Sequence, residues 1–158
     1  MIVLLQRVLE AQVVRRAEGG QAEEPLGAVG RGLLAFVCAE PGDSAAVIAK
    51  AARKTARLRI FEDENGKTNC SLADVDGEIL LISSLLCTRT AATETVRALR
   101  VREIQNWRTI STNTRWRAAP DRCGRSSTGI FGADMKVELL NDGPFTILLD
   151  SDTIVKKK

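Results

Sequence analysis

The chain has 158 residues, of which 44% are hydrophobic, and a formal net charge of +3 with no histidine and no tyrosine. This length suits one domain with a substantial apolar core. Histidine is the side chain most used for proton transfer near neutral pH and the commonest zinc ligand, so its absence excludes Ser-His-Asp, Cys-His and histidine-metal mechanisms. Catalysis must therefore rest on carboxylates, hydroxyls, thiols, backbone dipoles or the substrate itself.

Cysteine usage and the start of the chain predict a cytoplasmic protein with reduced thiols. The apolar first residues lack the charged region, unbroken core and cleavage site of a signal peptide. The cysteines show no C-x-x-C spacing: Cys38, Cys70, Cys87 and Cys123. No apolar run reaches the length of a membrane span, and the acids lack the spacing of metal ligands. We therefore expect no membrane segment, no metal and no cofactor.

The first strands are predicted by alternation of apolar residues. Residues 2–9 and 11–14 form two such segments, and a polar, glycine-containing segment, 18–25, separates them from the next strand. The polar residues in the first segment should face out. Its apolar contacts should come from Val3, Leu5 and Val8.

A buried strand, a helix and a tight turn are predicted next. The continuous apolar run 33–38 is typical of a central strand buried on both faces. Asp43 or Ser44 can cap a following helix that covers one face of the sheet. The apolar positions of this helix recur at helical spacing: Val47, Ile48, Ala51, Ala52 and Leu58. The pair Asn65-Gly66 then predicts a turn with positive φ.

The second half of the chain has a weakly patterned middle and a strongly patterned end. Residues 79–82 predict another buried strand, whereas 88–128 predict loops with at most a short helix at 93–104. Alternation then returns and predicts two strands around a turn at 141–144. Because the chain shows no repeat and no linker, these elements should form one domain.

The segment 91–125 is rich in arginine. It holds eight arginines against three acids, together with both tryptophans, Trp107 and Trp116. Arginine binds phosphates through two parallel hydrogen bonds and aromatic rings stack on bases, so this composition suits a nucleic-acid interface. A solvated face with tryptophans in the core explains it equally well.

The pair Gly143-Pro144 stands against a strand-like run, although proline cannot donate to a β-ladder. On its own the pair indicates a hairpin turn. The wider pattern, GIFGADM at 129–135 followed by NDGPFT at 141–146, resembles the C-terminal motif of the D-aminoacyl-tRNA deacylase family, G-x-F-x-A-x-M and then N-x-G-P-x-T. MIVLLQRV, VGRGLLAFV and RIFEDENGKTN also resemble the family's segments, in the same order.

This resemblance implies an α/β fold, a single domain over residues 1–155 with a barrel-like β-sheet and helices covering one side, followed by a basic tail at 156–158. It implies hydrolysis of the ester that joins a D-amino acid, or glycine, to the terminal adenosine of tRNA. It also implies a homodimer in which each subunit presents a cis Gly-Pro bond to the active site of its partner. Backbone N–H groups and the ribose 2′-hydroxyl would assist the attacking water.

Carried over to this sequence, the resemblance assigns roles to particular residues. Gly143 and Pro144 become the filter that captures the amino group and leaves no room for an L side chain. Asn141 and Thr146 belong to the same substrate-binding motif. The candidates for lining the adenosine pocket are Phe131, Ala133 and Met135.

The family's second motif, Ser-Gln-x-Thr-Leu at the end of a buried strand, aligns with Ser83-Ser84-Leu85-Leu86-Cys87. The backbone at Ser83, Ser84 and Leu86 supplies the catalytic candidates, while the glutamine and the threonine are replaced. Only seven residues separate Asp121 from Gly129, where the family has a long helix. Two alternatives stay open: a catalytically impaired member that binds tRNA or DNA, and a deacylase for L-alanine with a trans Gly-Pro bond.

Overall fold

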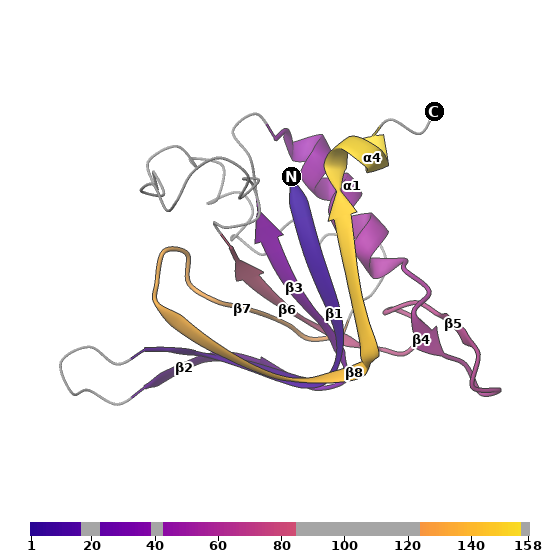
Figure 1. Ribbon diagram of the computed structural model, residues 1–158, viewed down its shortest axis with the longest axis horizontal. Helices are drawn as coiled ribbons and strands as arrows, with labels where there is room; N and C mark the ends of the chain where they lie inside the picture. The colour runs from indigo at the N-terminus through magenta and orange to yellow at the C-terminus, as the bar shows by residue number, and fades with distance from the viewer. Residues whose placement is uncertain (17–22, 39–42, 85–123, 156–158) are drawn as a thin grey trace.

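The computed structural model describes residues 1–16, 23–38, 43–84 and 124–155. The main sheet has six strands in the order β2-β1-β3-β6-β7, and β8 pairs with the other edge of β1 (Figure 1). These strands are β1 (Ile2–Arg15), β2 (Glu24–Val29), β3 (Gly32–Cys38), β6 (Glu78–Ser83), β7 (Ser126–Thr128) and β8 (Met135–Asp150). The remaining elements are α1 (Ala45–Ala56), β4 (Phe61–Glu62), β5 (Thr68–Cys70) and α4 (Ser151–Val155).

The sheet curls toward a barrel because its two ends approach each other. The Ser127 hydroxyl in β7 donates to the Ala28 carbonyl in β2 at 3.1 Å. A Cβ added to Gly27 would lie 2.9 Å from Cβ of Ser127, so glycine permits this close approach. The strands β2 and β7, which stand first and last in the strand order, therefore meet. The face of the sheet that they enclose is apolar.

Side chains of β3 alternate between two apolar clusters, which confirms that this strand is buried on both faces. The helix-side cluster, between the sheet and α1, consists of Met1, Val3, Leu5, Leu33, Ala35, Val37, Ile48, Ala51, Ala52, Ile60, Phe61, Leu72, Ile79, Leu81 and Leu149. The inner cluster, on the opposite face, consists of Val8, Ala11, Val13, Val29, Leu34, Leu80 and Ile82. The helix α1 covers only the first of these faces.

The first strand is continuous, and the prediction of two separate strands is wrong. Val8 pairs with Asn141 and Glu10 with Leu140, so Leu9 is an extra residue in the ladder. This bulge shifts the alternation by one residue. Val3 and Leu5 therefore face the helix-side cluster, whereas Val8 before the bulge and Ala11 and Val13 after it face the inner cluster. The strand β2 also begins at Glu24, inside the segment expected to be a polar connection.

The helix α1 begins as predicted and ends earlier. Ser44, the second of the two possible caps, accepts a hydrogen bond from the Val47 N–H at 3.3 Å. Ile48 and the two following alanines of the predicted stripe are buried. The helix ends at Ala56, so Leu58 packs against the helix-side cluster from the segment that follows.

The turn at Asn65-Gly66 is confirmed and joins the two short strands β4 and β5. Gly66 has a φ of +73°. The Asp63 carboxylate accepts hydrogen bonds from the backbone N–H groups of Asn65 at 2.9 Å and Lys67 at 3.0 Å. This small hairpin projects from the main sheet (Figure 1).

The final unit is one strand, β8, instead of two strands around a turn. Gln6 pairs with Thr146 and Val8 with Asn141, so a single residue of β1, Arg7, stands opposite four residues of β8. We call these four residues, 142–145, the Gly-Pro bulge. Because the bulge lies outside the regular ladder, Pro144 occupies a strand without breaking a ladder hydrogen bond.

Several predictions concern residues outside the described ranges. The expected loops and short helix at 88–128, the arginine-rich segment and the tail at 156–158 lie there almost entirely. The expectation of loops up to residue 128 is wrong at its described end, because Ser126–Thr128 form the strand β7, which pairs in parallel with β6. None of the described helices is long and apolar enough to cross a membrane. The described cysteines, Cys38 and Cys70, form no disulfide with each other.

The side chain of Thr55 in α1 is fully buried, and its hydroxyl has no hydrogen-bond partner among the residues that the structure describes. Replacement by valine keeps the shape and removes the unsatisfied group, so Thr55→Val should raise the free energy of unfolding by about 1 kcal/mol. Thr55→Ser keeps the hydroxyl and loses a methyl group, and should lower it by about as much. Urea unfolding measures both, and a loss of stability in the valine variant would contradict the assignment.

Candidate active site

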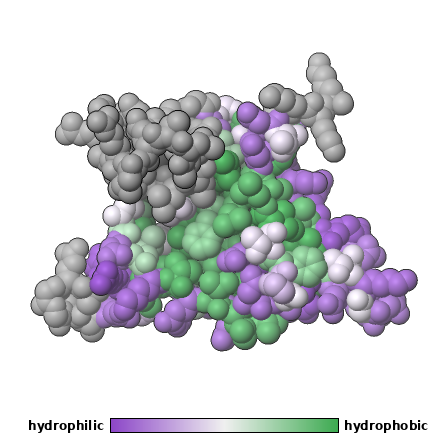
Figure 2. Space-filling model, viewed as in Figure 1, coloured by the Kyte–Doolittle hydropathy of each residue, from purple (hydrophilic) through white to green (hydrophobic). Residues whose placement is uncertain are grey.

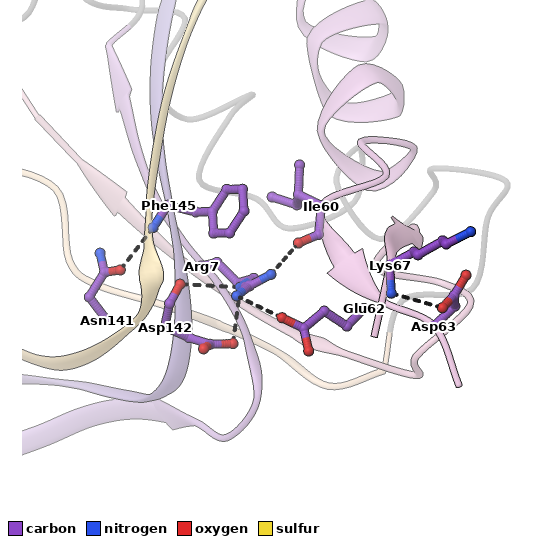
Figure 3. A network of polar contacts seen from close by, with 8 residues as sticks. All are labelled: Arg7, Ile60, Glu62, Asp63, Lys67, Asn141, Asp142 and Phe145. Atoms are coloured by element: carbon purple, nitrogen blue, oxygen red, sulfur yellow. Dashed lines mark hydrogen bonds and ion pairs between the residues drawn. The ribbon is translucent and has the colours of Figure 1, made fainter. Parts of the chain in front are cut away.

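A buried arginine holds the Gly-Pro bulge in place (Figure 3). The side chain of Arg7 is 3% exposed. Its Nε lies 3.0 Å from Oδ2 of Asp142 and donates to the Asp142 carbonyl at 3.2 Å, and its Nη1 donates to the Ile60 carbonyl at 2.5 Å. Glu62 lies 4.0 Å from Nη2. The planar guanidinium thus ties β1, the bulge and the segment before β4 together.

Arg7 was expected to face outward with the other polar residues of its strand, and that expectation is wrong. The inward direction of the Arg7 side chain could have been predicted from the sequence, because alternate residues of a strand, here Val3, Leu5 and Arg7, share one face. A charged residue at an inward position is buried only when partners satisfy it. The partners come from distant segments, which sequence alternation does not reveal.

Three further contacts fix the bulge from its own strand and from β1. The guanidinium carbon of Arg7 lies 4.2 Å from the centroid of the Phe145 ring, within cation–π range. The Phe145 N–H donates to Oδ1 of Asn141 at 3.2 Å. Nε2 of Gln6 donates to Oγ1 of Thr146 at 3.4 Å. Asn141 and Thr146 therefore flank the bulge and support its two ends.

Gly143 adopts a backbone conformation that other residues rarely adopt. Its φ is +121°, and the bond to Pro144 is cis. A Cβ built on this residue would lie 2.4 Å from Cδ2 of Phe145 and 3.2 Å from Nη2 of Arg7. Both the dihedral angle and the lack of space therefore require glycine.

The candidates for the adenosine pocket do not gather at one cluster. Phe131 packs against the helix-side cluster, and Met135 packs against the inner cluster. The Ala133 N–H donates to the Ile130 carbonyl at 3.4 Å, in a turn before β8. A Cβ on Gly129 would lie 2.7 Å from Sδ of Met135, so that glycine leaves room for the methionine beside the end of β6.

The candidate backbone donors lie at the end of β6. Ser83 is the last residue of this strand and pairs with Val37 of β3. The Ser84 N–H donates to the Val37 carbonyl at 3.0 Å, and the Ser84 carbonyl accepts from Sγ of Cys38 at 2.6 Å. The third candidate, Leu86, lies outside the described residues.

Comparison with known proteins identifies the family. The family sequence model described as D-Tyr-tRNA(Tyr) deacylase matches residues 4–150. The chain belongs to this deacylase family. The D-aminoacyl-tRNA deacylase of Lactobacillus acidophilus is 43% identical over 154 residues, which are 95% of this chain and 99% of the relative.

Solved structures agree with the deacylase assignment at the level of the fold. The "c-Myc DNA Unwinding Element Binding Protein" is 29% identical with a TM-score of 0.75, over 95% of this chain and 98% of its own. A "probable eukaryotic D-amino acid tRNA deacylase" is 16% identical with a TM-score of 0.67, and the match covers 94% of this chain and 98% of that chain. The predicted α/β fold with a barrel-like sheet and a helix on one side is confirmed.

Within one deacylase chain, the Gly-Pro bulge and the end of β6 are far apart. The bulge lies opposite Arg7, and Arg7 is level with Leu33 and with Ile79 of β6. Ser83 is the last residue of that strand, four residues further on. At about 3.3 Å per residue, these two levels differ by roughly 13 Å along the strands. The bulge and the Ser83 backbone of one chain are therefore not neighbours.

One other polar feature of the deacylase chain, the turn at Ser71 and Asp74, does not belong to this site. The Asp74 carboxylate accepts hydrogen bonds from the N–H and the hydroxyl of Ser71, both at 2.8 Å, and these bonds lower the pKa of Asp74. They stabilise the turn between β5 and β6 at neutral pH, and this contribution is lost as the pH falls through the lowered pKa. The described residues contain no group of three or more cysteines and acids that could hold a metal ion.

Proposed function

We propose that this protein hydrolyses the ester bond of D-aminoacyl-tRNA, and of glycyl-tRNA, and releases free amino acid and tRNA. We further propose that it reads chirality with the backbone of Gly143 and Pro144. The observation that carries the proposal is the anchored Gly-Pro bulge, because a main chain fixed by a buried arginine is a rigid wall. A D side chain or a hydrogen atom points away from this wall, whereas an L side chain meets it.

The reaction needs little acid–base chemistry from side chains. Water attacks the ester carbonyl, the tetrahedral intermediate collapses, and the terminal ribose hydroxyl of tRNA leaves with a proton. In the proposed mechanism, backbone N–H groups in the segment of Ser83, Ser84 and Leu86 stabilise the oxyanion. The Ser84 N–H already donates to the Val37 carbonyl, so we assign this role to the neighbouring N–H groups of the segment. The neighbouring 2′-hydroxyl of the substrate assists the water. We assign the adenosine to the segment that holds Phe131, Ala133 and Met135, although Phe131 and Met135 pack against different clusters within one chain. This scheme suits a chain without histidine.

We propose that the active unit is a homodimer in which the bulge of one subunit completes the site of the other. The distance between the bulge and Ser83 within one chain supports this arrangement. Among the described residues β8 pairs only with β1, and it exposes Leu140 at 50% and Leu148 at 63%. Figure 2 shows apolar side chains gathered across the middle of this face. An unpaired strand edge with exposed leucines is a surface that a second copy can cover.

Leu148→Asp tests the proposed dimer. A carboxylate at this exposed position should convert the dimer to a monomer and reduce hydrolysis together with dimerisation, because each site would lose the partner's bulge. Light scattering coupled to size-exclusion chromatography measures the mass. Thr68→Asp, an exposed change of the same charge on the hairpin β4-β5, serves as the charge-matched control. A monomeric wild-type protein, or a fully active monomeric variant, would contradict the dimer proposal.

The substrate also implies a cellular setting. A protein that acts on aminoacyl-tRNA needs a surface for the tRNA acceptor end, and we propose that it does so in the cytoplasm, where translation supplies this substrate. Release of labelled D-tyrosine from D-Tyr-tRNA, and of glycine from Gly-tRNA, tests the proposed reaction. Both should be released faster than in buffer alone. A folded protein that accelerates neither reaction would overturn the proposal.

A second candidate function is nucleic-acid binding without hydrolysis. One similar solved structure is named for binding a DNA unwinding element, and the segment 91–125 carries eight arginines against three acids. Replacement of the glutamine and the threonine in the second motif also favours this candidate. It predicts tRNA or DNA binding that weakens steeply with salt and is accompanied by no ester cleavage.

A further inference from the structure

Position 145 is left open by the motif pattern N-x-G-P-x-T, and this chain has phenylalanine there. The Phe145 ring lies against both the Arg7 guanidinium and the Gly143 backbone. We propose that Phe145 is a positioning residue that holds the main chain of Gly143 and thereby sets the discrimination between D- and L-aminoacyl-tRNA. This inference rests on the proposed function of the Gly-Pro bulge.

The first step is that the ring fills the space beside Gly143. The position that a Cβ of Gly143 would occupy is 2.4 Å from Cδ2 and 2.9 Å from Cε2 of the ring. The glycine therefore packs directly on the ring edge. A glycine has no side chain of its own to anchor it and is the most flexible residue in a chain. Contact with a large, planar neighbour restricts the movement of Gly143 toward that side.

The second step is that Phe145 is held both at its ring and at its backbone. Arg7 stacks on it at 4.2 Å, and the Phe145 N–H donates to Oδ1 of Asn141 at 3.2 Å. Arg7 is in turn fixed by the Ile60 carbonyl and by Asp142. Figure 3 shows the ring projecting from β8 beside the guanidinium. Gly143 is thus flanked by a ring that is stacked on a buried cation, and this cation is bonded in turn to the segment before β4.

The third step concerns what an aliphatic side chain would lack at this position. Valine or leucine fills part of the volume but presents no aromatic face to the guanidinium, so the stacking contact is lost. Alanine loses both the volume and the stacking. Tyrosine keeps the ring and adds a hydroxyl at its far end. The series Phe145→Ala, Phe145→Leu and Phe145→Tyr therefore separates ring stacking from simple space filling.

We expect Phe145→Ala and Phe145→Leu to lower the ratio of kcat/KM for D-Tyr-tRNA over L-Tyr-tRNA by about tenfold or more, because small displacements of a positioned group have large effects on rates. The change should come mainly from faster hydrolysis of L-Tyr-tRNA. Phe145→Tyr should keep the ratio of the wild type. Thermal unfolding of each variant shows how much stability is lost, and a merely structural role would lower both rates together without changing the ratio.

A crystal structure of Phe145→Ala supplies a readout that does not depend on activity. The inference predicts that Gly143 moves or becomes disordered in this variant and keeps its conformation in Phe145→Tyr. If the wild-type protein hydrolyses no D-aminoacyl-tRNA, the proposed function fails, and the crystal structure still decides whether Phe145 positions Gly143. An unchanged Gly143 in the alanine variant, or an unchanged D-to-L ratio, would overturn the inference.

Discussion

Gly143→Ala should abolish measurable hydrolysis of D-Tyr-tRNA while the protein still folds. The substitution has two separate costs. A φ of +121° is strained for an L residue, by about 1–3 kcal/mol. The new methyl group would also lie 2.4 Å from a carbon of the Phe145 ring, so the bulge must rearrange. A displaced bulge no longer presents its backbone at the correct distance, and kcat/KM should fall by about 100-fold or more.

Gly66→Ala is the matched control for this prediction. Gly66 also has a positive φ, +73°, but a Cβ there would have no atom within 4 Å among the described residues. The control carries the conformational cost of about 1 kcal/mol without any steric clash. It should lower the melting temperature slightly and leave hydrolysis unchanged. A Gly143→Ala variant that remains fully active and selective would show that the bulge does not read chirality.

Arg7→Ala should be the most destabilising single substitution in the site. The change leaves the Asp142 carboxylate and the Ile60 carbonyl without their donor and removes the stack on Phe145. Breaking a buried ion pair by removal of one partner costs about 3–5 kcal/mol, and the cost here should lie near the lower end because Asp142 is 29% exposed. Activity should fall with stability, since the bulge loses its anchor.

Two controls separate charge from geometry. Arg7→Lys keeps the charge but has no planar group to bridge Asp142 and Ile60 at once, so it should recover only part of the stability. Arg15→Ala removes an exposed arginine, 52% accessible, whose ion pair with Glu24 spans 2.7 Å. This control should cost less than about 1 kcal/mol. Urea unfolding measures all three, and equal losses for Arg7→Ala and Arg15→Ala would contradict the anchoring role.

Local sequence patterns correctly predicted those elements that are determined by a few neighbouring residues. The apolar run of β3, the serine cap of α1 and the Asn65-Gly66 turn each follow from a few adjacent residues. The bulges did not follow, because each one depends on the register between two strands. Leu9 is an ordinary apolar residue until β8 pairs with β1 on both sides of it.

The sequence predicted the Gly-Pro motif of the candidate site, but it did not predict the side-chain contacts that hold this motif in place. The pattern around Gly143 identified the family, while the partner that fixes the motif, Arg7, lies 135 residues away from Asp142 in the sequence. A polar residue in an apolar strand was expected to face solvent, and the structure buries it instead. Phe145 also carried no signal, since its importance arises from its contact with the guanidinium.

The most direct test of the account compares the wild-type protein on two substrates that differ only in chirality, D-Tyr-tRNA and L-Tyr-tRNA, under identical conditions. The account predicts rapid release of D-tyrosine, while L-Tyr-tRNA decays at the rate seen in buffer alone. Release of both amino acids at similar rates would show that the Gly143-Pro144 backbone does not select chirality. Release of neither by a folded dimer would contradict the catalytic claim itself.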